Sequence, residues 1–140
     1  MKYIKLFEDL LTPLNTNSIK GLLVELEDNG FDIKYKNTCM WPTNTIPGLF
    51  SNATDWEEVN GYIVKISKES FEYNDIKENV EVLIEYYDSV IHNYDILFSF
   101  ISSPLDDFLT PKVSNNISDV EEFLTNRKLS LFVIKIKNKS

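Results

Sequence analysis

The chain has 140 residues, a hydrophobic fraction of 43% and a formal net charge of −8, with only four glycines and five prolines. One domain of this length can bury a core without metals or disulfides, and the composition excludes a disordered or fibrous protein. The negative charge disfavours nucleic acid as a partner, because phosphate binding needs a basic surface.

The sequence predicts neither a membrane span nor a secretion signal. No apolar run approaches the roughly 20 residues that cross a bilayer. The acidic Glu8 and Asp9 interrupt the segment that would form the apolar part of a signal peptide. The single cysteine, Cys39, allows no internal disulfide, which fits a reducing compartment.

Apolar residues at helical spacing predict a short amphipathic helix over residues 1–14, ending near Pro13. This helix either docks on the domain and closes one end of its core, or forms a detachable tag or partner-binding segment. A strand over Lys2–Phe7 is the alternative. The first six elements would then follow the βαββαβ order of ferredoxin-like domains.

A helix and a strand follow as a pair between residues 15 and 36. Asn15–Ser18 supplies capping side chains, and Gly30 stands where a left-handed residue ends a helix. Four residues between them form one apolar face, namely Ile19, Leu22, Leu23 and Leu26. Beyond Gly30, Phe31, Ile33 and Tyr35 alternate with polar residues, which predicts a strand with one buried face.

Asn37–Thr54 is the least regular stretch, within a loop expected over residues 37–59. Loops of this length are uncommon unless they serve a function, so the stretch either forms a site or contains a short strand. Thr54–Glu57 fits a capping box and predicts one helical turn. Asn60–Gly61 instead fits a two-residue hairpin turn that would pair 56–59 with 62–65. Both alternatives stay open.

Residues 61–101 predict a β-α-β unit around which the domain is organised. Tyr62–Ile66 alternates with a period of two, Ser67–Glu72 is polar enough to turn, and Asn74 suits an N-cap. The helix that follows has one apolar face, formed by Ile76, Val80, Leu83, Tyr87 and Val90. The nearly all-apolar Ile96–Ile101 is typical of a central strand covered on both faces. Two strands joined in this way usually lie parallel, with a right-handed crossover.

The C-terminal third predicts a loop over Ser102–Lys112, a short helix and a last strand. Ser118–Glu121 fits a capping box that opens the helix. The last strand, Leu131–Lys137, places Phe132, Ile134 and Ile136 on one face. On the other face we interpret Lys135 and Lys137 as residues that guard a sheet edge against unwanted pairing.

Together these elements predict a single two-layer α+β domain over residues 15–140, preceded by the helix of residues 1–14. Its sheet would be mixed, with four or five strands and with helices mainly on one face. No internal repeat, low-complexity segment or linker divides the chain.

No residue pattern assigns a catalytic centre, a metal or a cofactor. The single histidine, His92, lies at the end of the central helix, where the helix dipole explains its presence. Cys39 and His92 could act as nucleophile and base only if the fold brought them together. The clustered carboxylates lack the spacing of metal-binding loops: Asp55, Glu57, Glu58, Asp106, Asp107, Glu121 and Glu122. The glycines form no phosphate-binding loop, so an enzyme is the less favoured class.

Charge is distributed unevenly along the chain. Residues 69–107 contain ten acidic residues against Lys77 alone, a net charge of −9, so the rest of the chain sums to +1. From Arg127 onward there are five basic residues and no acidic one. A solvated helix face explains the acidic run most simply. Two functional alternatives are a surface that imitates nucleic-acid phosphates, and a salt-sensitive head-to-tail contact with the basic last strand of a neighbouring copy.

Eight residues are therefore candidates for protein contacts: Glu78, Glu81, Glu85, Asp88, Lys135, Lys137, Trp41 and Trp56. The acids and the lysines belong to the two oppositely charged segments, and tryptophan is enriched at interfaces. They make a protein partner or self-association the expected interaction, and no small-molecule ligand is assigned.

Three segments, Met1–Glu8, Leu23–Phe31 and Tyr73–Lys77, resemble segments that recur in uncharacterised small proteins of tailed bacteriophages. In some large tailed phages a similar amphipathic N-terminus directs internal proteins into the prohead and is then removed. Leu6–Glu8 is similar to the hydrophobic-x-Glu pattern that the maturation proteases favour. The resemblance implies a location in the virion or the host cytoplasm, and it implies no activity.

We therefore expect a non-catalytic, phage-encoded interaction or structural protein, associated with the virion and acting through surface contacts. The first alternative is an acidic inhibitor or nucleic-acid mimic that binds a basic host protein. The second is a small hydrolase or nucleotide-handling enzyme, which a concave pocket holding Cys39 and His92 together would favour.

Overall fold

The computed structural model describes residues 15–43, 55–91, 93–102 and 112–138. Within them the chain forms three α-helices, one short 3-10 helix and five strands. Their bounds are α2 (Thr16–Asp28), β1 (Asp32–Pro42), β2 (Trp56–Glu72), η1 (Tyr73–Asp75), α3 (Lys77–Val90), β3 (Tyr94–Ser102), β4 (Lys112–Ser114), α4 (Ile117–Leu124) and β5 (Lys128–Asn138). The helix predicted for residues 1–14 lies outside the described residues.

The strands form one sheet in the order β1-β2-β5-β3-β4, and each neighbouring pair in the described part is antiparallel. β2 and β3, which η1 and α3 connect, therefore run in the same direction, with β5 between them. The predicted β-α-β unit is present, but the last strand of the chain is inserted between its two strands. The predicted α+β class, with one five-stranded sheet, is confirmed.

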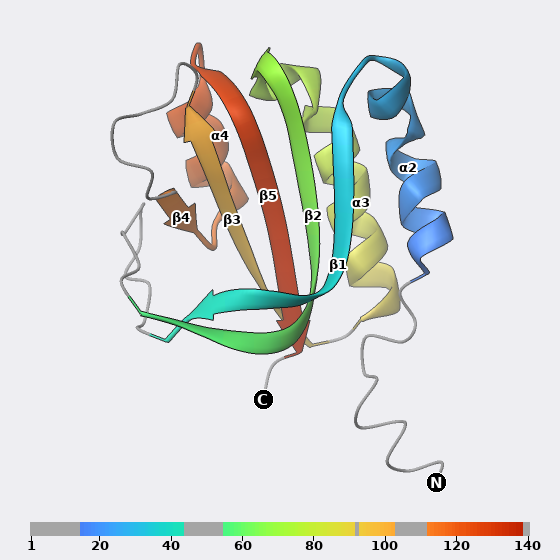
Figure 1. Ribbon diagram of the computed structural model, residues 1–140, viewed down its shortest axis with the longest axis vertical. Coiled ribbons are helices and arrows are strands. Elements are labelled where there is room, and N and C mark those ends of the chain that lie inside the picture. The colour runs from blue at the N-terminus through green and yellow to red at the C-terminus, as the bar shows by residue number, and fades with distance from the viewer. Residues whose placement is uncertain (1–14, 44–54, 92, 103–111, 139–140) are drawn as a thin grey trace, which may run out of the picture.

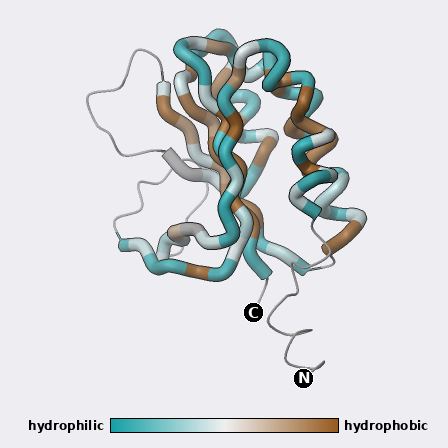
Figure 2. The backbone as a smooth tube through the Cα atoms, turned by 45° about the vertical axis from the view of Figure 1, so that its right-hand side comes forward, coloured by the Kyte–Doolittle hydropathy of each residue, from teal (hydrophilic) through white to brown (hydrophobic). Residues whose placement is uncertain are grey.

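The helices cover one face of the sheet and leave the other face open to the arm described below (Figure 1). The strands turn alternate residues towards the helices, among them Tyr62, Val64 and Ile66 of β2 and Phe132, Ile134 and Ile136 of β5. These side chains pack against buried residues of α2 and α3, among them Ile19, Leu23, Val80 and Leu83. Hydrophobic and hydrophilic stretches accordingly alternate along both layers (Figure 2). The main core lies between the sheet and the helices.

Helix α2 begins and ends where the sequence predicts. The side-chain oxygen of Asn15 accepts hydrogen bonds from the backbone N–H groups of Asn17 and Ser18. Gly30 has a φ of 91°, and the N–H of the next residue, Phe31, donates back to the carbonyl of Leu26. The chain turns there directly into β1.

Both alternatives for the region around residue 60 are wrong. β2 runs without interruption from Trp56 to Glu72, so neither a helical turn nor a hairpin at Asn60–Gly61 forms there. Between the pairs Lys36–Ile63 and Thr38–Asn60, the register advances by two residues on β1 and by three on β2. β2 therefore carries an extra residue near Gly61, and glycine inside a strand often marks such a bulge.

Two predictions between β2 and α3 are also wrong. Ser67–Glu72 continues the strand, with an irregular register against β5, where we expected a turn. Asn74 does not cap α3, because the short helix η1 intervenes and α3 starts only at Lys77. Glu72 and Asp75 form a capping box for η1, and Ile76 is the N-cap residue of α3, with no capping hydrogen bond from a side chain in the described part of the chain.

The C-terminal third differs from expectation in two details. Helix α4 forms as predicted, but its N-cap is Asn116, whose side chain accepts from the N–H groups of Ser118 and Asp119. The short strand β4 was not predicted. It begins at Lys112, the last residue of the expected loop, and it pairs with β3.

The position of β5 corrects the interpretation of its two lysines. β5 pairs with β2 on one side and with β3 on the other, so it is the middle strand of the sheet. Lys135 and Lys137 therefore guard no edge. They lie on the face opposite Ile134 and Ile136, because successive residues of a strand point to opposite faces.

The outer parts of β1 and β2 form a hairpin arm, which we define as residues 37–42 and 56–60. The two strands of the arm pair with each other along this length. β5 pairs with β2 only from Gly61 onward, so the arm is not part of the central sheet. Because a bulge bends a strand, the arm turns away at this point and crosses in front of the open face (Figure 1).

Candidate functional site

A second apolar cluster lies between the arm and the open face of the sheet. Four strands each contribute one buried residue to it: Trp41, Ile63, Leu97 and Val133. Three half-buried residues pack beside them: Trp56, Val59 and Leu131. Trp41 is only 8% exposed, so the arm is held to the sheet by its own apolar side chain.

Two lysines of β5 contact the tryptophans of the arm. Lys135 Nζ donates a 2.9 Å hydrogen bond to the backbone carbonyl oxygen of Met40 and lies 4.7 Å from the centre of the Trp56 ring. Lys137 Nζ lies 4.9 Å from the centre of the Trp41 ring. A cation over an aromatic face is attracted to the electrons of the ring. These contacts add to the apolar packing that holds the arm.

Apolar and lysine side chains alternate across the strands of the open face. Lys36 of β1 is paired with Ile63 of β2, which in turn is paired with Lys135 of β5. Two residues further along β2, and hence on the same face, Lys65 is paired with Val133. Each of these apolar side chains therefore has a lysine directly beside it.

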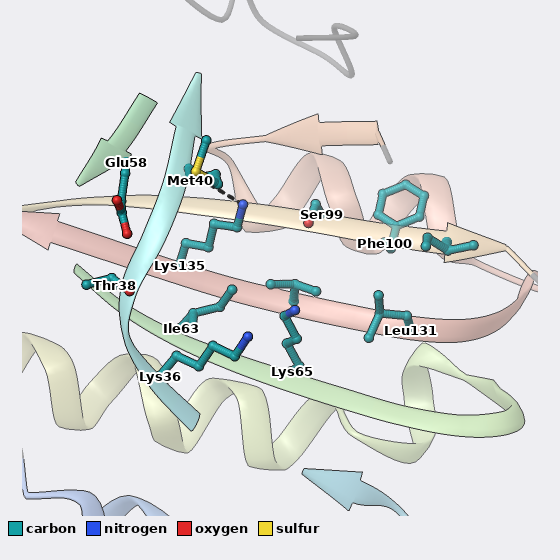
Figure 3. A pocket seen from close by; sticks show the side chains of 12 residues that line it. Lys36, Thr38, Met40, Glu58, Ile63, Lys65, Ser99, Phe100, Leu131 and Lys135 are labelled. Carbon is teal, nitrogen blue, oxygen red and sulfur yellow. Dashed lines mark hydrogen bonds between the residues drawn. The ribbon is translucent and has the colours of Figure 1, made fainter. Parts of the chain in front are cut away.

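A hollow of about 350 Å³ opens beside the arm (Figure 3). It is lined by residues of four strands: Lys36, Thr38, Met40, Glu58, Ile63, Lys65, Ser99, Phe100, Ile101, Leu131, Val133 and Lys135. Lys36 and Lys65 make no hydrogen bond or ion pair with the described residues. Binding pockets combine a mostly apolar lining with a few polar groups. The hollow can therefore receive an apolar group that carries negative charge beside it.

The four acidic candidates lie on the other side of the sheet. Glu78, Glu81, Glu85 and Asp88 are exposed on α3, which belongs to the helix layer. Asp88 accepts a hydrogen bond from the hydroxyl of Tyr94. The other three make no hydrogen bond or ion pair with the described residues. The structure thus brings the two lysine and two tryptophan candidates together at the arm and separates them from the acids.

Of the residues that line the hollow, the sequence predicted only Lys135 as a contact residue, and Lys36, Met40 and Lys65 are among those that it missed. Part of the signal was present, because Lys36 alternates with Tyr35, and Lys65 with Val64 and Ile66. This alternation places both lysines opposite the main core. It does not reveal that β1, β2 and β5 are neighbours, which is what gathers the lysines on one surface.

Among the described residues, those with a shifted pKa are five tyrosines on the helix side of the sheet. Burial raises the pKa of Tyr35 to about 12. Burial also raises the pKa of four others, Tyr62, Tyr73, Tyr87 and Tyr94. General acids and bases work best with a pKa near the operating pH, and these shifts lead away from neutrality. The tyrosines therefore stay protonated and act as packing groups.

The remaining chemical candidates are not assembled in the described part of the chain. Among the described residues, no three His, Cys, Asp or Glu side chains are grouped so that they could hold a metal ion. His92, Asp106 and Asp107 lie outside the described residues, as does the side chain of Cys39. Whether Cys39 and His92 meet, which the sequence did not favour, therefore stays untested. In the described ranges, no helix is both long enough and apolar enough to cross a membrane.

None of the protein-family models, curated proteins or solved structures compared with the chain matches it. The resemblance to bacteriophage proteins therefore stays a prediction. What the protein does has to be inferred from the open sheet face, the arm and the helices.

Proposed function

We propose that the protein is a non-catalytic interaction or structural protein that binds a partner through the open face of its sheet. The hollow beside the hairpin arm carries this proposal, because it combines an apolar floor with two lysines, Lys36 and Lys65, that make no hydrogen bond or ion pair with the described residues. The other face of the sheet is already used, since the helices pack on it to form the main core.

The chemistry of the hollow indicates what the partner presents. Ile63, Leu131 and Val133 offer apolar contact, and Lys36 and Lys65 offer positive charge. Apolar contact at the centre of an interface supplies affinity, and complementary charge supplies specificity and faster association. A protein surface with an apolar side chain flanked by carboxylates meets both conditions.

The bacteriophage resemblance supports the proposal of a role in the virion or in the cytoplasm of the infected host. There the protein would act as a component that other proteins contact.

An acidic inhibitor of a basic host protein is the second candidate. It is supported by three exposed carboxylates on α3 that make no hydrogen bond or ion pair within the described ranges, those of Glu78, Glu81 and Glu85. Such an inhibitor would bind through the helix side and not through the open sheet face.

A photo-crosslinking amino acid at position 40 tests the proposal in lysate of cells that produce the protein in its native setting. Met40 lines the hollow and is 46% exposed, whereas Val24 is 51% exposed on α2 and serves as the control position. We expect light-dependent adducts from position 40 and their loss when Lys36 and Lys65 are both replaced by Glu. Adducts from position 24 alone would favour the acidic inhibitor. Adducts from neither position would overturn both candidates.

A further inference from the structure

We propose that the hollow binds a small organic anion, a molecule with a carboxylate or phosphate head and a short apolar tail. The inference goes beyond the proposed function, because it assigns a small-molecule ligand to the hollow in addition to a protein partner. It is carried by the placement of two lysines, one buried hydroxyl group and an apolar strip that lies away from the arm.

Lys36 and Lys65 bring two positive charges to one part of the hollow. Lys36 is paired with Ile63, and Lys65 lies two residues further along β2, so the two lysines are diagonal neighbours about 7–8 Å apart. Figure 3 shows their nitrogen ends directed towards the same part of the hollow. Neither lysine makes a hydrogen bond or ion pair with the described residues. Like charges repel, and an anion held between the two ammonium groups would offset this repulsion.

Protection of a sheet edge does not explain Lys65. β1 is an edge strand in the observed order, and lysines on an edge strand hinder unwanted pairing. β2, however, pairs with β1 on one side and with β5 on the other. Lys65 is also paired directly with Lys34, and like charges opposite each other destabilise a sheet. These lysines form a basic surface on a protein whose net charge is −8, as an anion site requires.

Ser99 supplies a further hydrogen-bond donor from β3. Val133 is paired with Lys65 on one side and with Ser99 on the other, so the three residues form a row across β2, β5 and β3. Ser99 is 5% exposed, and its side chain makes no hydrogen bond with the described residues. Buried hydroxyl groups normally have a partner, and this one lines the hollow (Figure 3). It can donate to an oxygen of the anionic head.

The apolar tail would lie along Leu131 and Ile101. These two residues are paired on β5 and β3, two positions along from the pair of Val133 and Ser99. Both are half-buried, and both line the hollow. Figure 3 shows Leu131 on the side of the hollow away from the arm. The tail can therefore cover this strip while the arm stays in place.

The volume of the hollow favours a small ligand. It is about 350 Å³, near the lower end of the roughly 300–1,000 Å³ that is typical of ligand pockets. In the described part of the chain, Glu58 is the one acidic residue that lines it. Figure 3 shows Glu58 at the arm end, on the other side of Lys135 from Ser99. A head near Lys65 and Ser99 is thereby kept apart from that carboxylate.

Calorimetric titration with octanoate, octanol and acetate tests this site. Octanoate and octanol have tails of the same length, and only octanoate is charged. Hydrogen bonds to charged groups are stronger than those between neutral groups, so octanoate should bind about ten times more tightly than octanol. Acetate has the charge without the tail and should bind at least about ten times more weakly than octanoate. If octanol or acetate binds as tightly as octanoate, the inference is wrong.

Octyl phosphate distinguishes the two head groups. Tighter binding of octyl phosphate than of octanoate would support the site with a phosphate ester as its ligand. The reverse order would support it with a carboxylate. If neither probe binds, the hollow is not a site for organic anions.

Removal of the two charges localises the head. The double variant Lys36→Met with Lys65→Met keeps long apolar side chains, so octanoate should bind about ten times more weakly while octanol binding stays unchanged. Lys20→Met with Lys128→Met changes the net charge equally, but neither residue lines the hollow. This control should bind octanoate like the wild type. The inference fails if both variants bind octanoate equally well while circular dichroism shows them folded.

Methyl NMR localises the tail. The methyl signals of Leu131 and Ile101 should shift as octanoate is added, whereas those of Ile19, which is fully buried in the main core, should stay in place. Val24 and Val82 are exposed apolar residues of the helix layer. Shifts at these two valines without shifts at Leu131 and Ile101 would place the probe outside the hollow and overturn the inference.

The ligand site and the proposed function can fail separately. If neither octanoate nor octyl phosphate binds but position 40 crosslinks to a protein, the ligand site is excluded and the proposed function stands. If the probes bind in the hollow but position 40 crosslinks to no protein, the proposed function fails and the ligand site stands.

Discussion

The ammonium group of Lys135 lies 2.9 Å from the backbone carbonyl oxygen of Met40, although 95 positions separate the two residues in the chain. Lys135 belongs to the middle strand of the sheet, and Met40 belongs to the hairpin arm. Lys135 is buried, so most solvent is kept away from this hydrogen bond. The middle strand thereby fixes the arm, and with it one wall of the hollow.

Replacing Lys135 by methionine should loosen the arm. The substitution keeps most of the side chain's length but removes the donor to Met40, and a hydrogen bond from a charged group stabilises by about 1.5–3 kcal/mol. If the free energy of opening the arm falls by about 1.4 kcal/mol, its opening equilibrium constant rises about tenfold. The backbone amides of the arm should then exchange with solvent about ten times faster.

The matched control is Lys65→Met, on the same face but without a hydrogen bond to the described residues. We expect this control to leave the exchange of the arm amides unchanged, because surface substitutions away from specific contacts change stability by about 0.5 kcal/mol or less. Equal exchange rates in the two variants would show that Lys135 does not hold the arm.

Replacing Trp41 by alanine should destabilise the fold strongly. Trp41 is buried against Ile63, Leu97 and Val133, and removing a buried tryptophan costs about 3–5 kcal/mol. We expect a value near 3 kcal/mol, because the arm covers the cluster on one side only. Trp56→Ala should cost about 1 kcal/mol, since Trp56 is half-buried. Guanidinium denaturation followed by circular dichroism ranks the two, and a larger loss for Trp56→Ala would contradict the packing of the arm.

Gly21 and Gly30 should respond in opposite directions to replacement by alanine. Gly30 has a φ of 91°, where a Cβ costs about 1 kcal/mol or more, although the nearest atom, Lys68 Cε, would be at an ordinary 3.8 Å. Gly21 lies inside α2 with no atom within 4 Å of an added Cβ, so alanine should stabilise the helix by up to about 1 kcal/mol. Thermal unfolding should show a lower Tm for Gly30→Ala and a higher Tm for Gly21→Ala. Shifts of the same sign would contradict this assignment of the end of α2.

The fold should lose stability in alkaline solution. Burial raises the pKa of Tyr35 to about 12 and also raises the pKa of Tyr87, whereas tyrosine in the unfolded chain titrates near pH 10. Above about pH 10 the folded state therefore holds more protons than the unfolded state, and the free energy of unfolding falls as pH rises. Below about pH 9 both states are protonated at these groups, and they add no pH dependence.

Tyr87→Phe tests the same buried group. The hydroxyl of Tyr87 is buried and has no hydrogen-bond partner among the described residues. Phenylalanine removes this group, so we expect a gain of about 1 kcal/mol at neutral pH and a shallower decline above about pH 10. Urea denaturation at neutral and alkaline pH measures both effects. A loss of stability at neutral pH would show that the hydroxyl is bonded in the folded protein.

The sequence predicts which face each strand buries, because alternation is a local property. Ile134 and Ile136 lie in the main core and Lys135 does not, as the period of two requires. The ends of α2 are equally local, since Asn15 and Gly30 act on neighbouring backbone groups.

The order of the strands could not be predicted in this way. The position of β5 between β2 and β3 depends on pairing between residues some 70 positions apart, such as Val64 with Ile134. The edge interpretation of Lys135 failed for this reason. The hairpin arm was missed because a bulge near Gly61 breaks the alternation and imitates the sequence signal of a turn.

Photo-crosslinking from position 40, with position 24 as the control, tests most directly whether the open sheet face binds a partner protein. Met40 lines the hollow beside the arm, and Val24 lies on α2 in the helix layer. We expect light-dependent adducts from position 40 that disappear when Lys36 and Lys65 are both replaced by Glu. If position 40 gives no adducts, the open sheet face is not the binding surface.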